Sequence, residues 1–129
     1  MKTLFVTGAA FGALMLLAPS ISMAADPAHG QELFRGQCGV CHAAGAGDGD
    51  GGQGPSLVGV IGRKVGGDPN FSYTQAVMDY KGVWTQESLA HFIEDPQKLI
   101  PGTAMPVSVA DPADRADLAA YLASVKPAK

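Results

Sequence analysis

The sequence has few basic residues, and they are scattered along the chain. Its 129 residues include 9 Lys and Arg against 12 Asp and Glu, which gives a formal net charge of −3. A nucleic-acid-binding surface needs a patch of Lys and Arg, so this distribution excludes that class of function. The excess of acidic residues favours partners with basic patches, an attraction that weakens as salt is added.

Apolar runs long enough to span a membrane are also missing. The run over residues 4–17 follows Lys2 and is short for a membrane span. Small residues, ending in Ala24 and Ala25, come after it. This order of positive, apolar and small residues is typical of a secretory signal peptide. We therefore expect residues 1–25 to be a signal peptide cleaved after Ala24 or Ala25, which leaves a periplasmic protein with no stable membrane insertion. The alternative is that the segment is retained as an anchor.

Strand patterns and internal repeats are absent, and residues 26–129 are predicted to form one all-α domain. Asp26-Pro27 and Asp111-Pro112 each combine an N-cap acceptor with a proline suited to the first helical position. Pro96 should end or closely follow a helix. The predicted helices run from about Pro27 to Gln37, from Thr74 to Tyr80, from Thr85 to Asp95 and from Asp111 onward, the last with Leu118, Tyr121, Leu122 and Val125 on one face.

A glycine-rich segment separates the first two helices. Residues 43–54 read AAGAGDGDGGQG, a composition that sustains neither helix nor strand. Asp48 and Asp50 raise the possibility of a calcium loop, but the bidentate Glu and the other ligands of such a loop are missing. The segment is therefore predicted to be a flexible, solvated loop.

Only two cysteines are present, Cys38 and Cys41, and His42 follows directly. Structural zinc needs four ligands and the chain has no second Cys pair, whereas a redox dithiol usually belongs to a strand-rich fold. The spacing Cys-x-x-Cys-His is typical of a covalent haem attachment site. The two thiols form thioether bonds to the porphyrin vinyl groups, and the His becomes the proximal iron ligand. The motif predicts one covalently attached haem c.

Met105 is the predicted second axial ligand of the iron. The first three of the five methionines fall in the signal peptide, and Met78 lies on a predicted short helix, where packing is the expected role. Met105 lies in residues 100–106, a stiff stretch with two prolines and one glycine that can hold a side chain at a fixed point. The alternative is that Met105 only fills the core. His29 and His91 are rival nitrogen ligands, expected instead to be solvated surface residues.

With these ligands placed, the chain resembles a class I cytochrome c of the mitochondrial and bacterial c2 type. The resemblance covers about Ala28 to Val125. It implies three to five short helices wrapped around one haem, with the N- and C-terminal helices crossing. The motifs that carry it, besides the haem motif, are Gly54-Pro55-x-Leu57, Gly62-Arg63-Lys64, Phe71-Ser72-Tyr73-Thr74, Trp84, Pro101-Gly102-Thr103-x-Met105 and Leu118-x-x-Tyr121.

The resemblance also implies roles for individual residues. The Pro55 carbonyl should accept a hydrogen bond from His42 Nδ1, and Gly30 and Phe34 should cross the last helix at Leu118 and Tyr121. Two features depart from the family: Phe92 stands where relatives usually have a Tyr that meets the Met sulfur, and the lysine-rich rim of the mitochondrial proteins is missing. The cofactor-binding residues implied besides Cys38 and Cys41 are Pro55, Phe92 and Thr103, together with Arg63, Tyr73 and Trp84, which should hold the haem propionates.

These expectations define an electron-transfer protein rather than an enzyme. An iron with both axial positions filled has no open site for a substrate. The predicted function is a monomeric carrier of single electrons, as in a respiratory chain, that docks transiently with redox proteins at the exposed haem edge. Two alternatives stay open: a haem c subunit of a larger periplasmic oxidoreductase, and a ligand-binding haem protein in which Met105 leaves the iron.

Overall fold

The computed structural model describes residues 23–45, 47–49 and 51–129. The predicted signal peptide falls largely on residues 1–22, outside the described residues. No helix in the described part of the chain combines the length and the apolar character that a membrane crossing requires.

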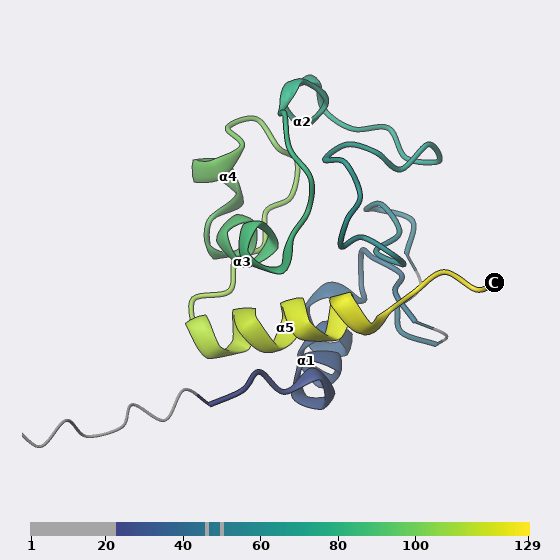
Figure 1. Ribbon diagram of the computed structural model, residues 1–129. Helices are drawn as coiled ribbons and strands as arrows, with labels where there is room; N and C mark the ends of the chain where they lie inside the picture. The colour runs from purple at the N-terminus through teal and green to yellow at the C-terminus, as the bar shows by residue number, and fades with distance from the viewer. Residues whose placement is uncertain (1–22, 46, 50) are drawn as a thin grey trace, which may run out of the picture.

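The fold is all-α, as predicted, with α3 and α4 on one side of the molecule and long loops on the other (Figure 1). The described residues contain no strand, and one isolated antiparallel β-bridge pairs Lys64 with Val83. The elements are α1 (Pro27–Leu33), a π-helical turn η1 (Phe34–Cys38), α2 (Gln75–Asp79), α3 (Gln86–Glu94), α4 (Pro96–Leu99) and α5 (Pro112–Ser124).

The helix starts follow from local sequence. Asp26 Oδ1 accepts a hydrogen bond from Ala28 N at 2.9 Å, and Asp111 Oδ1 accepts one from Ala113 N at 2.8 Å. Thr85 forms a reciprocal capping box with Ser88. These three predicted starts are therefore confirmed.

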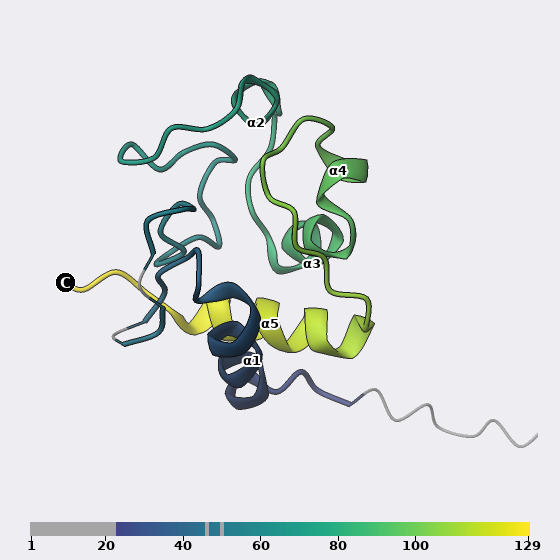
Figure 2. The ribbon, with the colours of Figure 1, turned by 180° about the vertical axis from the view of Figure 1, so that it is seen from behind.

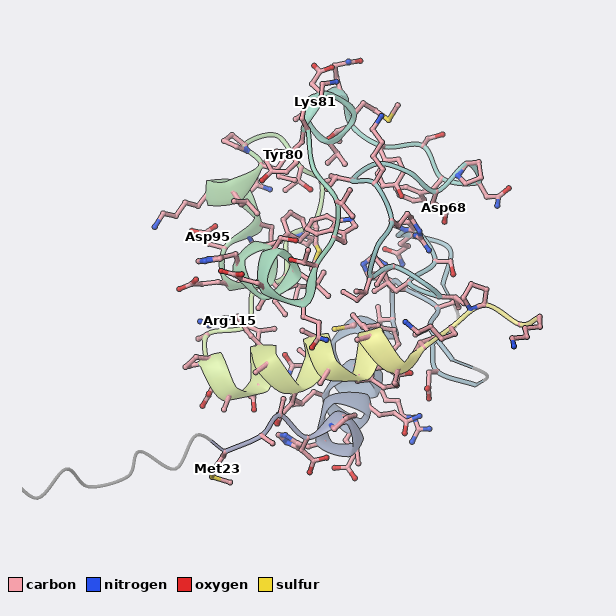
Figure 3. All side chains as sticks on the ribbon, viewed as in Figure 1. Met23, Asp68, Tyr80, Lys81, Asp95 and Arg115 are labelled. Carbon is pink, nitrogen blue, oxygen red and sulfur yellow. The ribbon has the colours of Figure 1, made fainter. Side chains whose placement is uncertain are left out.

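The first helix ends earlier than predicted, whereas Pro96 closely follows α3, as predicted, and starts a short helix that was not predicted. The α-helix that starts at Pro27 ends at Leu33, and the chain continues as the wider turn η1, closed by a hydrogen bond from Gly39 N to Phe34 O of 2.8 Å. Pro96 begins the further short helix α4, for which Asp95 is the N-cap, at the junction labelled in Figure 3. The π-turn matters for function because it delivers Cys38 at its last position.

Helices α1 and α5 cross at one side of the molecule, as Figures 1 and 2 show from opposite directions. Gly30 lies at the crossing point, where a Cβ atom would stand only 2.0 Å from the Asp117 carbonyl oxygen. Phe34 is fully buried, and its ring packs against that of Tyr121 with centroids 5.5 Å apart. The predicted crossing of the two terminal helices is confirmed.

His29 is exposed, as predicted, but it is paired rather than merely solvated. Its Nδ1 lies 2.8 Å from Asp117 Oδ2, and Oδ1 of the same carboxylate accepts a hydrogen bond from Asp26 N at 2.6 Å. The hydrogen bond to Asp117 raises the pKa of His29, and the same bond lowers the pKa of Asp117. The pair therefore fastens the start of α1 to the side of α5.

The expectation that residues 43–54 form a solvated loop is wrong for Asp48. Its side chain is almost fully buried, with 1% of the residue exposed. The Tyr121 hydroxyl and Gln31 Nε2 donate to Asp48 Oδ2, and Arg35 Nε donates to Oδ1 at 2.6 Å. A carboxylate can be buried here because three donors from α1, η1 and α5 replace its water. Asp48 thus ties this loop to the helix crossing.

We expect the Asp48→Asn substitution to lower the free energy of unfolding at neutral pH by about 1–3 kcal/mol. The NH2 group of the new amide would replace a carboxylate oxygen, and it would then face a nitrogen donor that cannot accept a hydrogen bond from it. The hydrogen bond from Tyr121 is the main cause that lowers the pKa of Asp48 from 3.8 to about 2. Because the pKa of Asp48 is lowered in the folded protein, its ionised form stabilises the fold at pH values above 3.8. This contribution is lost as the pH falls from 3.8 towards 2. Urea unfolding of both proteins should therefore show the difference narrowing over that range.

Asp79→Asn is the matched control, because Asp79 is an exposed carboxylate whose bond from Gln75 stays within α2. It should change the unfolding free energy little at any pH. A difference between wild type and Asp48→Asn that stays constant from neutral pH down to acid would contradict the assigned role of the Asp48 charge.

Candidate functional site

A cavity of about 350 Å³ lies between α3, α5 and the connecting loops. This volume is within the usual range of ligand and cofactor pockets, and the lining is mainly apolar, with Leu89, Ile93, Leu118 and Leu122 from α3 and α5. The structure places all of the sequence-predicted site residues in this one lining: Cys38, Cys41, His42, Pro55, Arg63, Tyr73, Trp84, Phe92, Thr103 and Met105.

The cysteine–histidine segment is a tight turn that continues η1. The amide nitrogens of Cys41 and His42 both donate to Cys38 O at 3.0 Å. Both thiols are free and partly buried, and burial is the main cause that raises the pKa of Cys38 to about 11. The two sulfurs and the imidazole are thus presented to the same cavity from one turn of backbone.

His42 has a fixed orientation. Its Nδ1 lies 2.8 Å from Pro55 O, and because a carbonyl only accepts, Nδ1 carries the hydrogen. Gly54 packs directly on the ring, since a Cβ atom there would lie 2.4 Å from His42 Cε1. The lone pair of Nε2 is therefore free to bind a metal, which is the usual arrangement of a metal-bound histidine.

The loop that carries Met105 is fixed by a glycine turn and by hydrogen bonds to the Gln97 side chain. Gly102 has φ of +95°, a conformation that favours glycine, and Thr103 is buried. Gln97 on α4 donates to Thr103 O at 2.6 Å and accepts from Gly102 N at 3.4 Å. These contacts fix the loop directly before Met105, whose side chain lines the cavity.

Arg63 and Tyr73 are further polar residues of the cavity lining. Arg63 donates to the carbonyl oxygens of Ser56 and Val58, so part of its guanidinium is already engaged with backbone. The Tyr73 hydroxyl accepts from Asp68 N at 3.1 Å, which leaves its own hydrogen available to a further acceptor.

One buried hydroxyl of the cavity wall has no partner. Thr74 Oγ1 is fully buried and makes no hydrogen bond, although Thr74 is the N-cap of α2, where its hydroxyl would ordinarily accept from the helix. A buried polar atom without a partner is rare and indicates a missing ligand group or water. Together with the free Tyr73 hydrogen, it fits an acidic group of a bound cofactor, so the residues present fit haem.

Several site features could not be read from the sequence. Gln97 has no distinguishing pattern, and Thr74 was predicted to start a helix and belongs to one of the resemblance motifs, but it was given no role in the site. Packing was the wrong role for Met78, since this residue is 51% exposed. His91 is exposed, with its ring 3.7 Å from Glu94, and does not line the cavity. Among the described residues, no group of three or more His, Cys, Asp or Glu could hold a metal ion; Asp50, the other residue of the calcium alternative, lies outside the described residues.

Comparison with known proteins gives a consistent result. The family model for cytochrome c matches residues 27–126. The chain is 42% identical over 102 residues to a cytochrome c2 of Rhodopila globiformis, covering 78% of this chain and 94% of the relative. It is 40% identical over 111 residues to a cytochrome c2 of Agrobacterium tumefaciens, covering 81% and 98%. Among solved structures, cytochrome cH from Methylobacterium extorquens matches with a TM-score of 0.68 and 34% identity, over 77% of this chain and 98% of that one.

Proposed function

The chain belongs to the cytochrome c family, and we propose that it is an exported single-electron carrier whose iron is held by His42 and Met105. It is a class I monohaem cytochrome c with one covalently attached haem c, and an electron-transfer protein rather than an enzyme. Haem c supplies the one-electron redox centre. The axial ligands, the propionate contacts and the cell compartment are the parts we propose.

The observation that carries the proposed ligation is the convergence of these side chains on a single cavity. Cys38 and Cys41 would form the thioether bonds, and His42 is already oriented by Pro55 O, with Nε2 free. Met105 is the only methionine among the cavity-lining described residues, and neither His29 nor His91 lines the cavity. His42 and Met105 are therefore the best supported axial pair.

The cavity lining would also set the reduction potential. A thioether is a weak donor that favours the reduced iron, and an apolar surrounding penalises the extra positive charge of the oxidised iron. Phe92 packs against Trp84 with ring centroids 5.1 Å apart and has no hydroxyl with which to contact the Met105 sulfur. Both the ligand and the lining thus favour a potential well above that of the hydrogen electrode.

The propionates are proposed to lie where Tyr73, Thr74, Trp84 and Arg63 line the cavity. Thr74 Oγ1 needs a partner, and Tyr73 has a hydrogen to donate, so these two hydroxyls would be the principal contacts. Arg63 already donates to two carbonyl oxygens. It would therefore act on the propionates mainly through the electrostatic attraction of its positive charge, rather than through direct hydrogen bonds.

Location in the periplasm is proposed from the leader-like order of residues 1–25 and from the haem attachment motif. Export would bring Cys38 and Cys41 to the compartment in which haem is attached covalently. Transient contacts with redox proteins, rather than a permanent subunit interface, would then complete the carrier function.

The reduction potential of the purified holoprotein tests this proposal, together with the oxidised absorption spectrum. We expect a potential well above the hydrogen electrode and the weak red band that is characteristic of methionine bound to oxidised iron. A low potential without that band would mean that Met105 is not a ligand, and the ligand-binding alternative would then be favoured.

A further inference from the structure

The exposed residues that line the cavity are all uncharged. Five of the described lining residues are exposed to solvent, and they mark where the cavity meets the surface; we refer to them as the mouth. They are Gln37, Gln53, Ser72, Ala104 and Pro106.

The mouth adjoins the residues proposed to hold the cofactor. Gln37 precedes Cys38, and Ala104 and Pro106 flank Met105 in the chain. The Cys41 sulfur lies 3.9 Å from Gln53 Oε1. Val40, between the two cysteines, is 72% exposed but does not line the cavity. The cofactor would therefore come nearest to the surface within a rim of amide, hydroxyl and apolar groups.

Among the described residues that line the cavity, Arg63 carries the one charged side chain, apart from the imidazole of His42. Its guanidinium is engaged by backbone carbonyl groups. The guanidinium donates to Ser56 O at 2.7 Å and to Val58 O, and the residue is only partly exposed. The net negative charge of the chain is thus carried outside the mouth. The five residues of the mouth contribute no charged side chain to the contact.

We propose that the mouth, as the docking surface expected of such a carrier, selects redox partners whose own cofactor edge is framed by uncharged, mainly apolar groups. This inference rests on the proposed function. A partner with a charged patch would have to remove water from its charges against a surface that offers no opposite charge. An uncharged patch loses little on contact and gains from the burial of Ala104 and Pro106.

This proposal refines the expectation from composition that basic patches would be preferred. The net negative charge of the acidic residues still attracts basic partners at long range, but these residues do not form the contact itself. Without local steering, association should proceed at the rate of neutral surfaces, about 10⁵–10⁶ M⁻¹s⁻¹. The contact should be small, as in other transient redox encounters.

Electron self-exchange between two copies of the holoprotein tests the proposal, with the second copy as the probe. One electron passes from a reduced copy to an oxidised copy, so the amounts of both forms stay constant and no other reagent is needed. The rate can be measured by exchange of NMR signals between the two forms. Self-exchange through the mouth brings two mouths together, so a charge placed there meets an identical charge.

The variants are Ala104→Lys and Ala104→Glu in the mouth, with Ala116→Lys and Ala116→Glu as controls of equal net charge. Ala116 is exposed on α5 and does not line the cavity. Both Ala104 variants should slow self-exchange about tenfold or more, whichever the sign, because like charges across a contact are strongly unfavourable. The Ala116 variants should change it less than about twofold, in opposite directions for the two signs, through net charge alone.

Cross-exchange between the Ala104→Lys and Ala104→Glu variants completes the test. It should be faster than self-exchange of either variant, because opposite charges then meet at the contact. If the Ala104 variants behave like the Ala116 variants, the contact lies elsewhere and this inference is overturned while the carrier function stands. A holoprotein without reversible one-electron reduction would overturn the proposed function itself, and this inference with it.

Discussion

Replacing Gly30 by alanine is expected to lower the free energy of unfolding by about 3 kcal/mol or more, a large part of the roughly 5–15 kcal/mol that is typical of a folded domain. The added Cβ would stand 2.0 Å from Asp117 O and 2.5 Å from Asp117 C. Both are backbone atoms of α5, so no side chain can rotate away to relieve the contact. The helices would have to separate, which would loosen the packing of Phe34 against Tyr121.

Gly36→Ala is the matched control for this substitution. Gly36 lies in η1 on the same segment, and a Cβ there would meet nothing within 4 Å. Alanine also costs less conformational entropy than glycine, so this variant should be unchanged or up to about 1 kcal/mol more stable. Urea unfolding followed by circular dichroism would measure both. Equal effects of the two substitutions would show that helical propensity, rather than the close crossing, determines the result.

Local signals in the sequence were sufficient for most of the helices. The caps at Asp26, Thr85 and Asp111 were predicted because an acceptor at the N-cap, followed by a proline at Asp26 and Asp111, acts over only a few residues. The buried face of α5 was predicted from spacing alone, because apolar residues three and four apart share one side of a helix. Such features depend little on the rest of the chain.

Asp48 illustrates what local sequence cannot provide. Its neighbours are glycines, which correctly indicate a loop, but burial depends on donors that lie 13, 17 and 73 positions away in the chain. Nothing near Asp48 in sequence distinguishes it from a solvated carboxylate. Its position is decided by tertiary contacts with Arg35, Gln31 and Tyr121, which only the assembled fold brings together.

The candidate site divides in the same way. Cys38, Cys41 and His42 are contiguous and follow a fixed spacing, so they could be predicted directly. Thr74 was missed because its unpartnered hydroxyl is visible only once the cavity around it is known. Gln97 was missed because its two hydrogen bonds to residues 102 and 103 depend on where α4 ends.

Met105→Ala is expected to lower the reduction potential by a large margin, on the order of 0.2 V within the ~0.8 V range that axial ligands span in haem proteins. The attachment residues Cys38, Cys41 and His42 lie on a different segment, so the haem should stay covalently bound. Loss of the thioether removes the ligand that favours the reduced iron and opens one axial position. The red absorption band should disappear, and the reduced protein should bind carbon monoxide.

Met78→Ala is the control that separates ligation from general loss of a methionine. Met78 is the other methionine beyond residue 25, and it is 51% exposed on α2, away from the cavity lining. Its replacement should leave the potential, the red band and the inertness towards carbon monoxide unchanged. If Met105→Ala kept the wild-type potential, another side chain would have to be the ligand. His29 is held by Asp117 and His91 lies outside the cavity. Either histidine could therefore reach the iron only after a rearrangement of the fold.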